Sequence, residues 1–257
     1  MRTLASTLAP SFAVQRWIVF YALIAAAWVL LFASHLEFTR ARLAVDAPFA
    51  PEFWRAMCAT QPSFPAIVAM WSLMAVGMMA PAAVPMLRTY DDLVHAGAGT
   101  QTGFWSLLAG YLAVWLGFSL LAAGAQFGLQ HAGLLAPDGS STSRVFSAAL
   151  LALAGLYQFS ALKHACLRAC RAPLTSFMGD WRPGWRYAFR KGVTEGAYCL
   201  GCCWALMALA FAAGVMNLMF MGLAMALMIA EKTALLGPRG SRALGAALCL
   251  ASVFVLA

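Results

Sequence analysis

The sequence predicts an all-α fold, a polytopic transmembrane helical bundle, and two observations indicate it. Of the 257 residues, 63% are hydrophobic and only 10% are charged, whereas about 25% are charged in an ordinary soluble domain. Apolar stretches of about 20 residues, long enough to cross a ~30 Å hydrocarbon core as a helix, recur along the chain. No long linker or low-complexity tract divides the chain. We therefore expect a single transmembrane domain over residues 1–257, embedded in a lipid bilayer.

Taken in chain order, the apolar stretches predict about seven membrane spans. Five follow directly from hydropathy: residues 17–33, 64–86, 103–129, 144–162 with a helical extension to about Cys170, and 243–257. Pro173 fits the end of that extension, because proline cannot continue a helix. The first stretch resembles the core of a signal peptide, but no small-residue cleavage site follows it. We therefore expect it to be a retained helix.

The remaining two spans come from one long apolar stretch. Residues 197–230 contain 34 residues and no charge. As one helix they would be about 51 Å long, which is far more than a bilayer core needs. Glycine and asparagine favour tight turns, and both occur at residues 214–217. We therefore expect two helices with a turn there.

The distribution of basic residues supports this count. With the N-terminus in the cytoplasm, seven spans place 13 basic residues on the inner side and 4 on the outer side. Fusing the fifth and sixth spans would move Lys232, Arg239 and Arg242 to the outer side. Cytoplasmic segments of membrane proteins carry the excess of Lys and Arg. The sequence thus predicts an N-in/C-out orientation.

Charge and cysteine content exclude other classes of protein. The net charge of +8 does not form a basic stripe with interleaved aromatic residues, so we expect no nucleic-acid partner. The seven cysteines do not form a disulfide framework, because the chain is not a small secreted domain. No nucleotide-binding loop is present, so ATP bound to this chain would drive no transport.

The segment of residues 195–207 carries the most informative pattern. Positions three and four apart share a helix face, so one stripe combines Glu195, Cys199, Cys202, Cys203 and Met207. Cysteine can also be a small hydrophobe that packs between helices. Three cysteines within five residues, with an acid one turn before and a thioether one turn after, favour a metal site over packing.

A second cysteine segment lies at the end of the fourth predicted span. Cys166 and Cys170 are four residues apart, so their sulfurs can share a ligand. The charge count assigns both cysteine segments to the same membrane depth. Neighbouring Lys163 and His164 are candidates to support the site, although a histidine in a basic segment is more often solvated.

Methionine and the intramembrane acids complete the candidate site. Met78, Met79 and Met207 are the expected auxiliary thioether ligands, although methionine is also a flexible core filler. Pro81 follows the methionine stripe of the second span, and broken helices in membranes tend to line cavities. Glu231, like Glu195, lies at a span end where an acid is unusual, and is a second supporting candidate.

Several of these segments together carry a resemblance to a known family. They are MWSLMAVGMMAPAAVPM (70–86), YQFSALKHACLRACRAP (157–173), GAYCLGCCWALM (196–207), GVMNLMFM (214–221) and the pair Glu231-Lys232. The chain resembles, most strongly over residues 65–237, the bacterial family called domain of unknown function 2182, described as predicted metal-binding integral membrane proteins. The resemblance implies a multi-pass protein of the bacterial inner membrane that binds a metal.

Thiolate and thioether ligands together select soft metals. Cu(I) is the best match and zinc the second, because zinc rarely uses methionine. We therefore expect a copper-handling protein, more a carrier or donor than an enzyme, which exchanges the ion with a membrane or soluble partner. The alternative is a membrane thiol–disulfide oxidoreductase that uses Cys199-x-x-Cys202 with quinone. A structural subunit of a larger complex is the third possibility.

Overall fold

The computed structural model describes residues 9–42, 63–136, 138–179, 181–233 and 235–257. Within the first helix, it describes the side chains from Val14 to Leu36 only. Over this part of the chain the fold is helical. The elements are α1 (Ala9–Arg42), α3 (Phe64–Met79), the 3-10 turn η1 (Pro81–Ala83), α4 (Val84–His95), α5 (Gln101–His131), α6 (Arg144–Tyr157), α7 (Ala161–Arg171), α8 (Pro173–Met178), α9 (Trp185–Ala208), α10 (Ala210–Ala213), α11 (Leu218–Lys232) and α12 (Pro238–Leu256).

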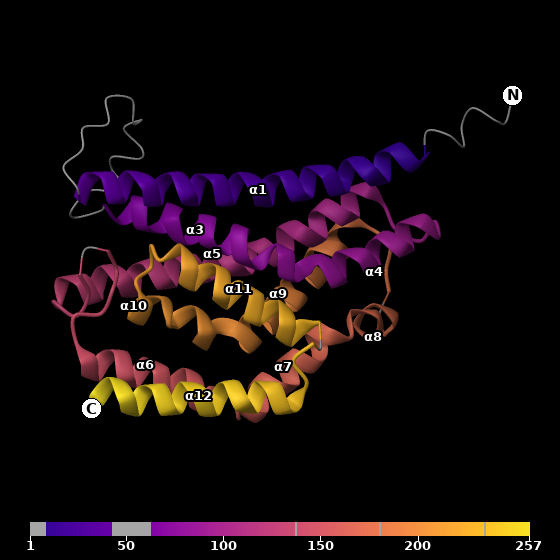
Figure 1. Cartoon of the computed structure of the whole chain (residues 1–257). Coiled ribbons are helices and arrows are strands. Elements are labelled where there is room, and N and C mark those ends of the chain that lie inside the picture. The colour runs from indigo at the N-terminus through magenta and orange to yellow at the C-terminus, as the bar shows by residue number, and fades with distance from the viewer. Residues whose placement is uncertain (1–8, 43–62, 137, 180, 234) are drawn as a thin grey trace, which may run out of the picture.

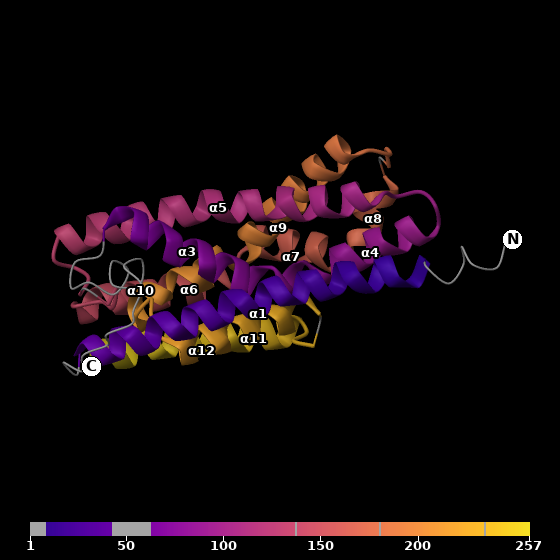
Figure 2. The same ribbon diagram turned by 90° about the horizontal axis from the view of Figure 1, so that it is seen from above.

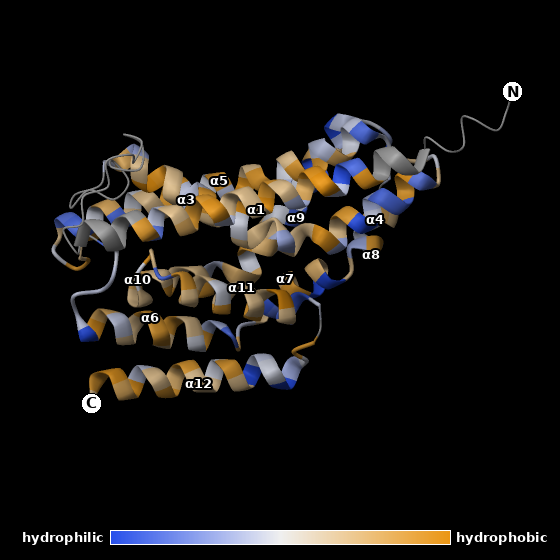
Figure 3. Ribbon diagram, turned by 45° about the horizontal axis from the view of Figure 1, so that its top comes forward, coloured by the Kyte–Doolittle hydropathy of each residue, from blue (hydrophilic) through white to orange (hydrophobic). Residues whose placement is uncertain are grey.

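The long helices lie side by side in an elongated bundle (Figures 1 and 2). α1 begins at one end of this bundle and α12 ends at the other. Hydrophobic residues cover the middle of the helices, while hydrophilic residues gather towards the ends, including α4 and the start of α12 (Figure 3). This distribution is the one that a bilayer-spanning bundle requires.

Five helical segments are long and apolar enough to cross a membrane: Val14–Leu36, Phe64–His95, Gln101–His131, Trp185–Ala213 and Pro238–Leu256. The α6–α7 pair makes a sixth if its bent halves form one span. The expected count of seven is not confirmed, because α11 has only 15 residues and is about 22 Å long. The predicted orientation stays a prediction.

The expected break in the long apolar stretch is confirmed. α10 ends at Ala213 and α11 begins at Leu218. Gly214 has a φ of 93°, a backbone conformation that favours glycine. The side chain of Asn217 then accepts a hydrogen bond from the amide of Phe220 (3.0 Å) and so caps the start of α11.

The fourth predicted helix is not continuous, which corrects the expectation for residues 144–170. α6 ends at Tyr157, α7 begins at Ala161, and the two axes differ by 62°. Ser160 accepts a hydrogen bond from the amide of Lys163 (3.1 Å). The serine side chain thus supplies an acceptor for an amide group in the first turn of α7, which has no partner within the helix. Both cysteines of this segment therefore lie on a separate helix, α7.

The helix carrying the methionine stripe is interrupted at Pro81, as expected. Pro81 has no amide hydrogen, so the carbonyl of Gly77 loses its helical partner, and it accepts instead from Trp28 Nε1 (3.0 Å). The amide of Ala83 bonds to Ala80 in the 3-10 turn (3.0 Å). The carbonyl of Met79 is thereby released, and it accepts from the Tyr111 hydroxyl (2.9 Å).

Glycines bring α5 and α9 into backbone contact. A Cβ on Gly110 would lie 2.1 Å from the carbonyl oxygen of Phe189, and one on Gly192 would lie 2.0 Å from that of Leu107. Small residues allow this close approach between membrane helices. The contact fixes the position of α9, the helix that carries three cysteines.

Candidate metal centre

The cysteine stripe of α9 forms one buried helix face. Glu195 is 4% exposed, Cys199 is 1% exposed, and Cys202, Cys203 and Met207 are each 2% exposed. The helical spacing thus predicted the shared environment of these five side chains. They face the interior of the bundle.

α7 brings the second cysteine segment against this stripe. A Cβ on Gly201 would lie 2.6 Å from the sulfur of Cys166, so the glycine leaves the space that this sulfur occupies. Cys170 lies within side-chain hydrogen-bonding reach of Cys202. The expected proximity of the two cysteine segments is therefore confirmed. We call Cys166, Cys170, Cys199, Cys202 and Cys203 the sulfur cluster.

Cys199 has two polar partners from other helices. The ammonium nitrogen of Lys232, on α11, donates to Cys199 Sγ over 2.6 Å. The hydroxyl of Tyr111, on α5, lies 2.8 Å from the same sulfur. Because this hydroxyl also donates to the Met79 carbonyl, Tyr111 joins the proline break in the second span to the sulfur cluster.

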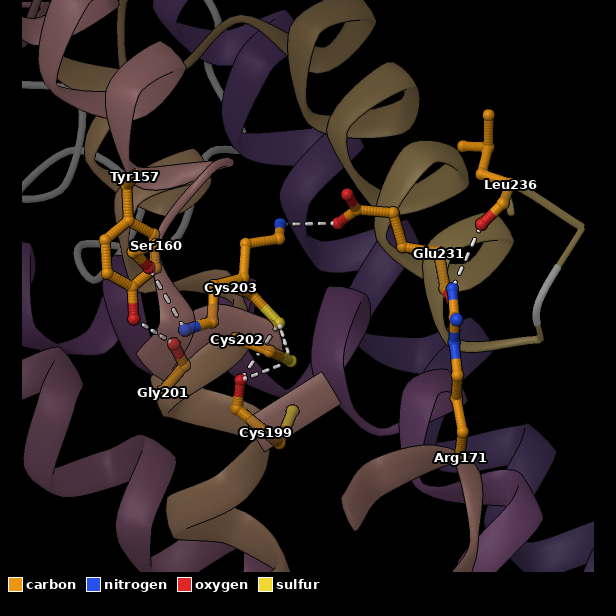
Figure 4. Close-up of polar contacts among 10 residues, drawn as sticks. Tyr157, Ser160, Arg171, Cys199, Gly201, Cys202, Cys203, Glu231 and Leu236 are labelled. Atoms are coloured by element: carbon orange, nitrogen blue, oxygen red, sulfur yellow. Dashed lines mark hydrogen bonds and ion pairs between the residues drawn. The ribbon is translucent and has the colours of Figure 1, made fainter. Parts of the chain in front are cut away.

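Cys202 and Cys203 turn towards the backbone of their own helix (Figure 4). Their sulfurs lie 3.1 and 3.0 Å from the carbonyl oxygen of Cys199, to which each thiol donates. The two sulfurs are 3.2 Å apart. The six described cysteines, which include all members of the cluster, are free thiols.

A buried ion pair lies beside the cluster and ties α7 to α11. Lys163 Nζ donates to Glu231 Oε2 over 2.7 Å, and both side chains are at most 3% exposed. On the same helix as Lys163, Arg171 donates to the backbone carbonyl of Glu231 and, over 3.0 Å, to that of Leu236 (Figure 4). These contacts hold the end of α11, and with it Lys232, against α7.

The other predicted site residues make no hydrogen bond to the sulfurs among the contacts of the described residues. Glu195 accepts from the hydroxyl of Ser176 on α8 (2.6 Å) and lies 4.0 Å from Lys191. Met78, Met79 and Met207 are buried in the same hydrophobic core as the cysteines. His164 lines a separate pocket on another face of α7, so the structure does not bring it into the cluster.

Two residues at the site carried no prediction of their own as site residues. Lys232 was visible only as part of the resemblance, and its cysteine partner lies 33 positions away. Tyr111 is one aromatic residue in an apolar span, a pattern without any functional signal. Only the packing of α5 and α11 against α9 reveals both.

The cluster is not arranged as a finished metal site. No group of three or more His, Cys, Asp or Glu side chains among the described residues could hold a metal ion as placed. Two sulfurs, each about 2.3 Å from a metal at a tetrahedral angle, would be about 3.8 Å apart, whereas those of Cys202 and Cys203 are 3.2 Å apart. Coordination therefore requires at least one of these side chains to rotate away from the Cys199 carbonyl.

One comparison with known proteins bears on this arrangement. Residues 68–255 match the family described as "PpoB2: Copper chaperone". The match includes all five cysteines of the sulfur cluster together with Tyr111 and Lys232. No curated protein and no solved structure matches the chain.

Proposed function

The chain belongs to the PpoB2 copper chaperone family, and we propose that it is an integral membrane protein that binds Cu(I) in the sulfur cluster and passes it to a partner. The observation that carries this proposal is the convergence of α7 and α9, which sets Cys170 beside Cys202. Two cysteine segments whose nearest members, Cys170 and Cys199, are 29 positions apart in sequence meet inside an apolar bundle, although packing alone does not require free thiols to gather.

The chemistry of the cluster favours a soft metal. Five cysteine sulfurs converge, and Met79 and Met207 are buried in the surrounding core. Thiolate and thioether ligands select Cu(I), while zinc remains the second choice. We propose Met78, Met79 and Met207 as auxiliary ligands that the ion reaches when side chains rotate.

Lys232 supplies the charge that such a site needs. A Cu(I) ion bound by two thiolates carries a net charge of −1, which is costly to bury without a partner. Lys232 is 5% exposed and already contacts Cys199. We propose that its ammonium group neutralises the copper–thiolate complex. Glu195, Glu231 and Lys163 would then support the site without binding copper, whereas His164 lies outside the cluster.

Differences in exposure suggest the route of the ion. Cys166 and Cys170 are half-buried, whereas Cys199, Cys202 and Cys203 are buried. We propose that copper arrives at Cys166 and Cys170 and moves to Cys202 and Cys203 by exchange of one thiolate ligand for the next. A carrier needs such stepwise exchange, because an ion held in a closed site could not be passed on.

The finer features of location are part of the same proposal. The resemblance to the family called domain of unknown function 2182 favours the bacterial inner membrane, and the count of basic residues favours seven spans in an N-in/C-out orientation. The thiol–disulfide oxidoreductase alternative gains no support, because the matched family handles copper and Cys199 is directed at Lys232 and Tyr111. We therefore do not carry it further.

The experiment is an anaerobic Cu(I) titration of the purified protein against a chromophoric chelator. We expect the wild type to retain about one Cu(I) per chain. Cys202→Ser should lose at least tenfold in affinity, about 1.4 kcal/mol, because serine offers a hard, protonated oxygen in nearly the same volume. The matched control is Cys249→Ser, a half-buried free cysteine on α12 outside the cluster, which should bind copper as the wild type does.

Folding must be measured in the same samples. If Cys202→Ser keeps the wild-type elution profile and unfolding midpoint but loses copper, the cysteine is a ligand rather than a packing residue. Equal copper affinity in Cys202→Ser and Cys249→Ser would overturn the proposal. Loss of copper in both variants would also overturn it, since the loss would then not be specific to the cysteines of the cluster.

A further inference from the structure

A pocket of about 340 Å³ lies between α7 and the beginning of α12. It lies on a different part of α7 from Cys170, and none of its lining residues belongs to the sulfur cluster. Its volume falls within the range of small-molecule sites, about 300–1,000 Å³. The pocket therefore needs an explanation separate from copper.

The ionisable side chains that line the pocket are arginines and one histidine. α7 contributes His164, Arg168 and Arg171, and none of the described residues lining the pocket is acidic. Arg171 is partly committed to the carbonyl groups of Glu231 and Leu236. Arg168 lines the pocket, is exposed, and has no carboxylate partner among the residues that the structure describes. Such a wall attracts an anion.

A serine with a buried hydroxyl group lines the same pocket. Ser241 on α12 is 1% exposed, and its Oγ has no hydrogen-bond partner among the described residues. Its backbone amide already bonds to the carbonyl of Gly237 (3.2 Å), so the hydroxyl is not needed to cap the helix. Leaving a buried hydroxyl unpaired costs about 1–3 kcal/mol. Because Ser241 lines the pocket, a rotation of its side chain would let this unpaired donor reach an acceptor bound there.

The start of α12 adds a second attraction for an anion. Pro238 is the first residue of this 19-residue helix and lines the pocket together with Ser241. The N-terminus of a helix carries a partial positive charge, although the amides of Gly240 and Ser241 already bond to the carbonyl of Gly237 here. Guanidinium, hydroxyl and helix N-terminus together form the donor set that recognises phosphate.

We propose that this pocket binds a phosphate group. Two sources share that chemistry: the headgroup of an anionic phospholipid and free phosphate. The lipid is the favoured source, because the start of α12 lies where the hydrophilic end of the bundle meets its apolar middle (Figure 3). Basic pockets between membrane helices at this depth bind anionic headgroups. Since α7 also carries Cys166 and Cys170, the bound phosphate steadies the helix that presents these cysteines.

The test uses the full-length protein in detergent micelles and three probes: short-chain phosphatidylglycerol, short-chain phosphatidylcholine and inorganic phosphate. The readouts are the thermal unfolding midpoint and the bound mass in native mass spectrometry. We expect phosphatidylglycerol to raise the midpoint in a saturable way, with phosphatidylcholine much weaker. A saturable rise with inorganic phosphate alone would support the site and identify a soluble source. No saturable effect of any probe would overturn the proposal.

Variants separate a specific site from general attraction of charge. Arg168→Gln should weaken binding of phosphatidylglycerol about tenfold, whereas Arg190→Gln, an exposed arginine of α9 that does not line the pocket, should leave it unchanged. Equal weakening by both substitutions would mean only general attraction and would overturn the proposal.

Ser241→Ala tests the unpaired hydroxyl. It should weaken phosphatidylglycerol binding several-fold while leaving the protein without added lipid as stable as the wild type or more stable, because it removes an unpaired buried hydroxyl. A purely structural serine would give the reverse, lower stability with unchanged binding. Unchanged binding in Ser241→Ala, like unchanged binding in Arg168→Gln, would overturn the proposal.

Discussion

Two neighbouring residues at the end of α11 show two ways of burying a charge. Glu231 is 2% exposed and Lys232 is 5% exposed. Glu231 pairs with an ordinary partner of opposite charge, Lys163. Lys232 instead meets a cysteine sulfur and, through it, a tyrosine hydroxyl. Only Lys232 has a partner, the sulfur of Cys199, whose charge changes when it binds a metal ion.

The difference separates a structural feature from a functional one. The Lys163–Glu231 pair is neutral in itself and stays so whether or not copper is bound. The positive charge of Lys232 is matched only when the nearby sulfurs are ionised, as they must be to bind a metal. We therefore expect substitutions on the Glu231 side to change stability, and substitutions on the Lys232 side to change copper binding.

The largest expected effect comes from breaking the ordinary pair. Glu231→Gln leaves the Lys163 ammonium buried without an opposite charge, which should cost about 3–5 kcal/mol. Thermal unfolding in detergent would measure it as a large drop in midpoint or as loss of folded protein. The control is the double variant Lys163→Met with Glu231→Leu, which should recover most of the loss, because apolar pairs replace buried ion pairs at little cost. A double variant as unstable as the single one would refute this role.

A smaller effect is expected from Tyr111→Phe. The substitution removes the hydroxyl that serves the carbonyl of Met79, and an unpaired buried acceptor costs about 1–3 kcal/mol. Copper affinity should fall as well, because the same hydroxyl contacts Cys199. Tyr198→Phe, an exposed tyrosine on α9, is the matched control. The account fails here if the two variants unfold at the same temperature.

The smallest loss of stability is expected from Lys232→Met. The substitution removes a buried ammonium group that has no opposite charge while the sulfurs are protonated, so the protein without copper should be as stable as the wild type or more stable. Copper affinity should nevertheless fall about tenfold, because the negative copper–thiolate complex loses its counter-charge. A loss of stability as large as that of Glu231→Gln, with unchanged copper affinity, would remove the distinction between the two residues.

The sequence predicted what depends on composition and helical period. The fold class, the turn at Gly214 and the common face of Cys199, Cys202 and Cys203 all follow from local patterns. Proximity of the two cysteine segments was predicted as well, because charge counting placed both at one membrane depth. The fold class, the turn and the common face require no knowledge of which helices touch, whereas the proximity of the two segments also depends on the packing of α7 against α9.

Other features depend on contacts that a sequence does not reveal. The break before α7 coincides with Ser160, which caps a new helix. From the sequence alone, a single serine within an apolar stretch does not predict that a helix ends there. α11 is short because it ends where Arg171 and Lys163 hold it. Tyr111 and Lys232 act only because α5 and α11 pack against α9. Long-range packing, rather than local propensity, decided each of these.

The most direct test of the copper site is X-ray absorption at the copper K edge. Wild-type protein loaded with one Cu(I) should show a first shell of sulfur alone, at about 2.3 Å, and Cys249→Ser should give the same spectrum. The double variant Cys202→Ser with Cys203→Ser should lose sulfur from that shell or fail to hold copper. A first shell of nitrogen or oxygen in the wild type, or a sulfur shell unchanged in the double variant, would contradict the assignment of copper to the sulfur cluster.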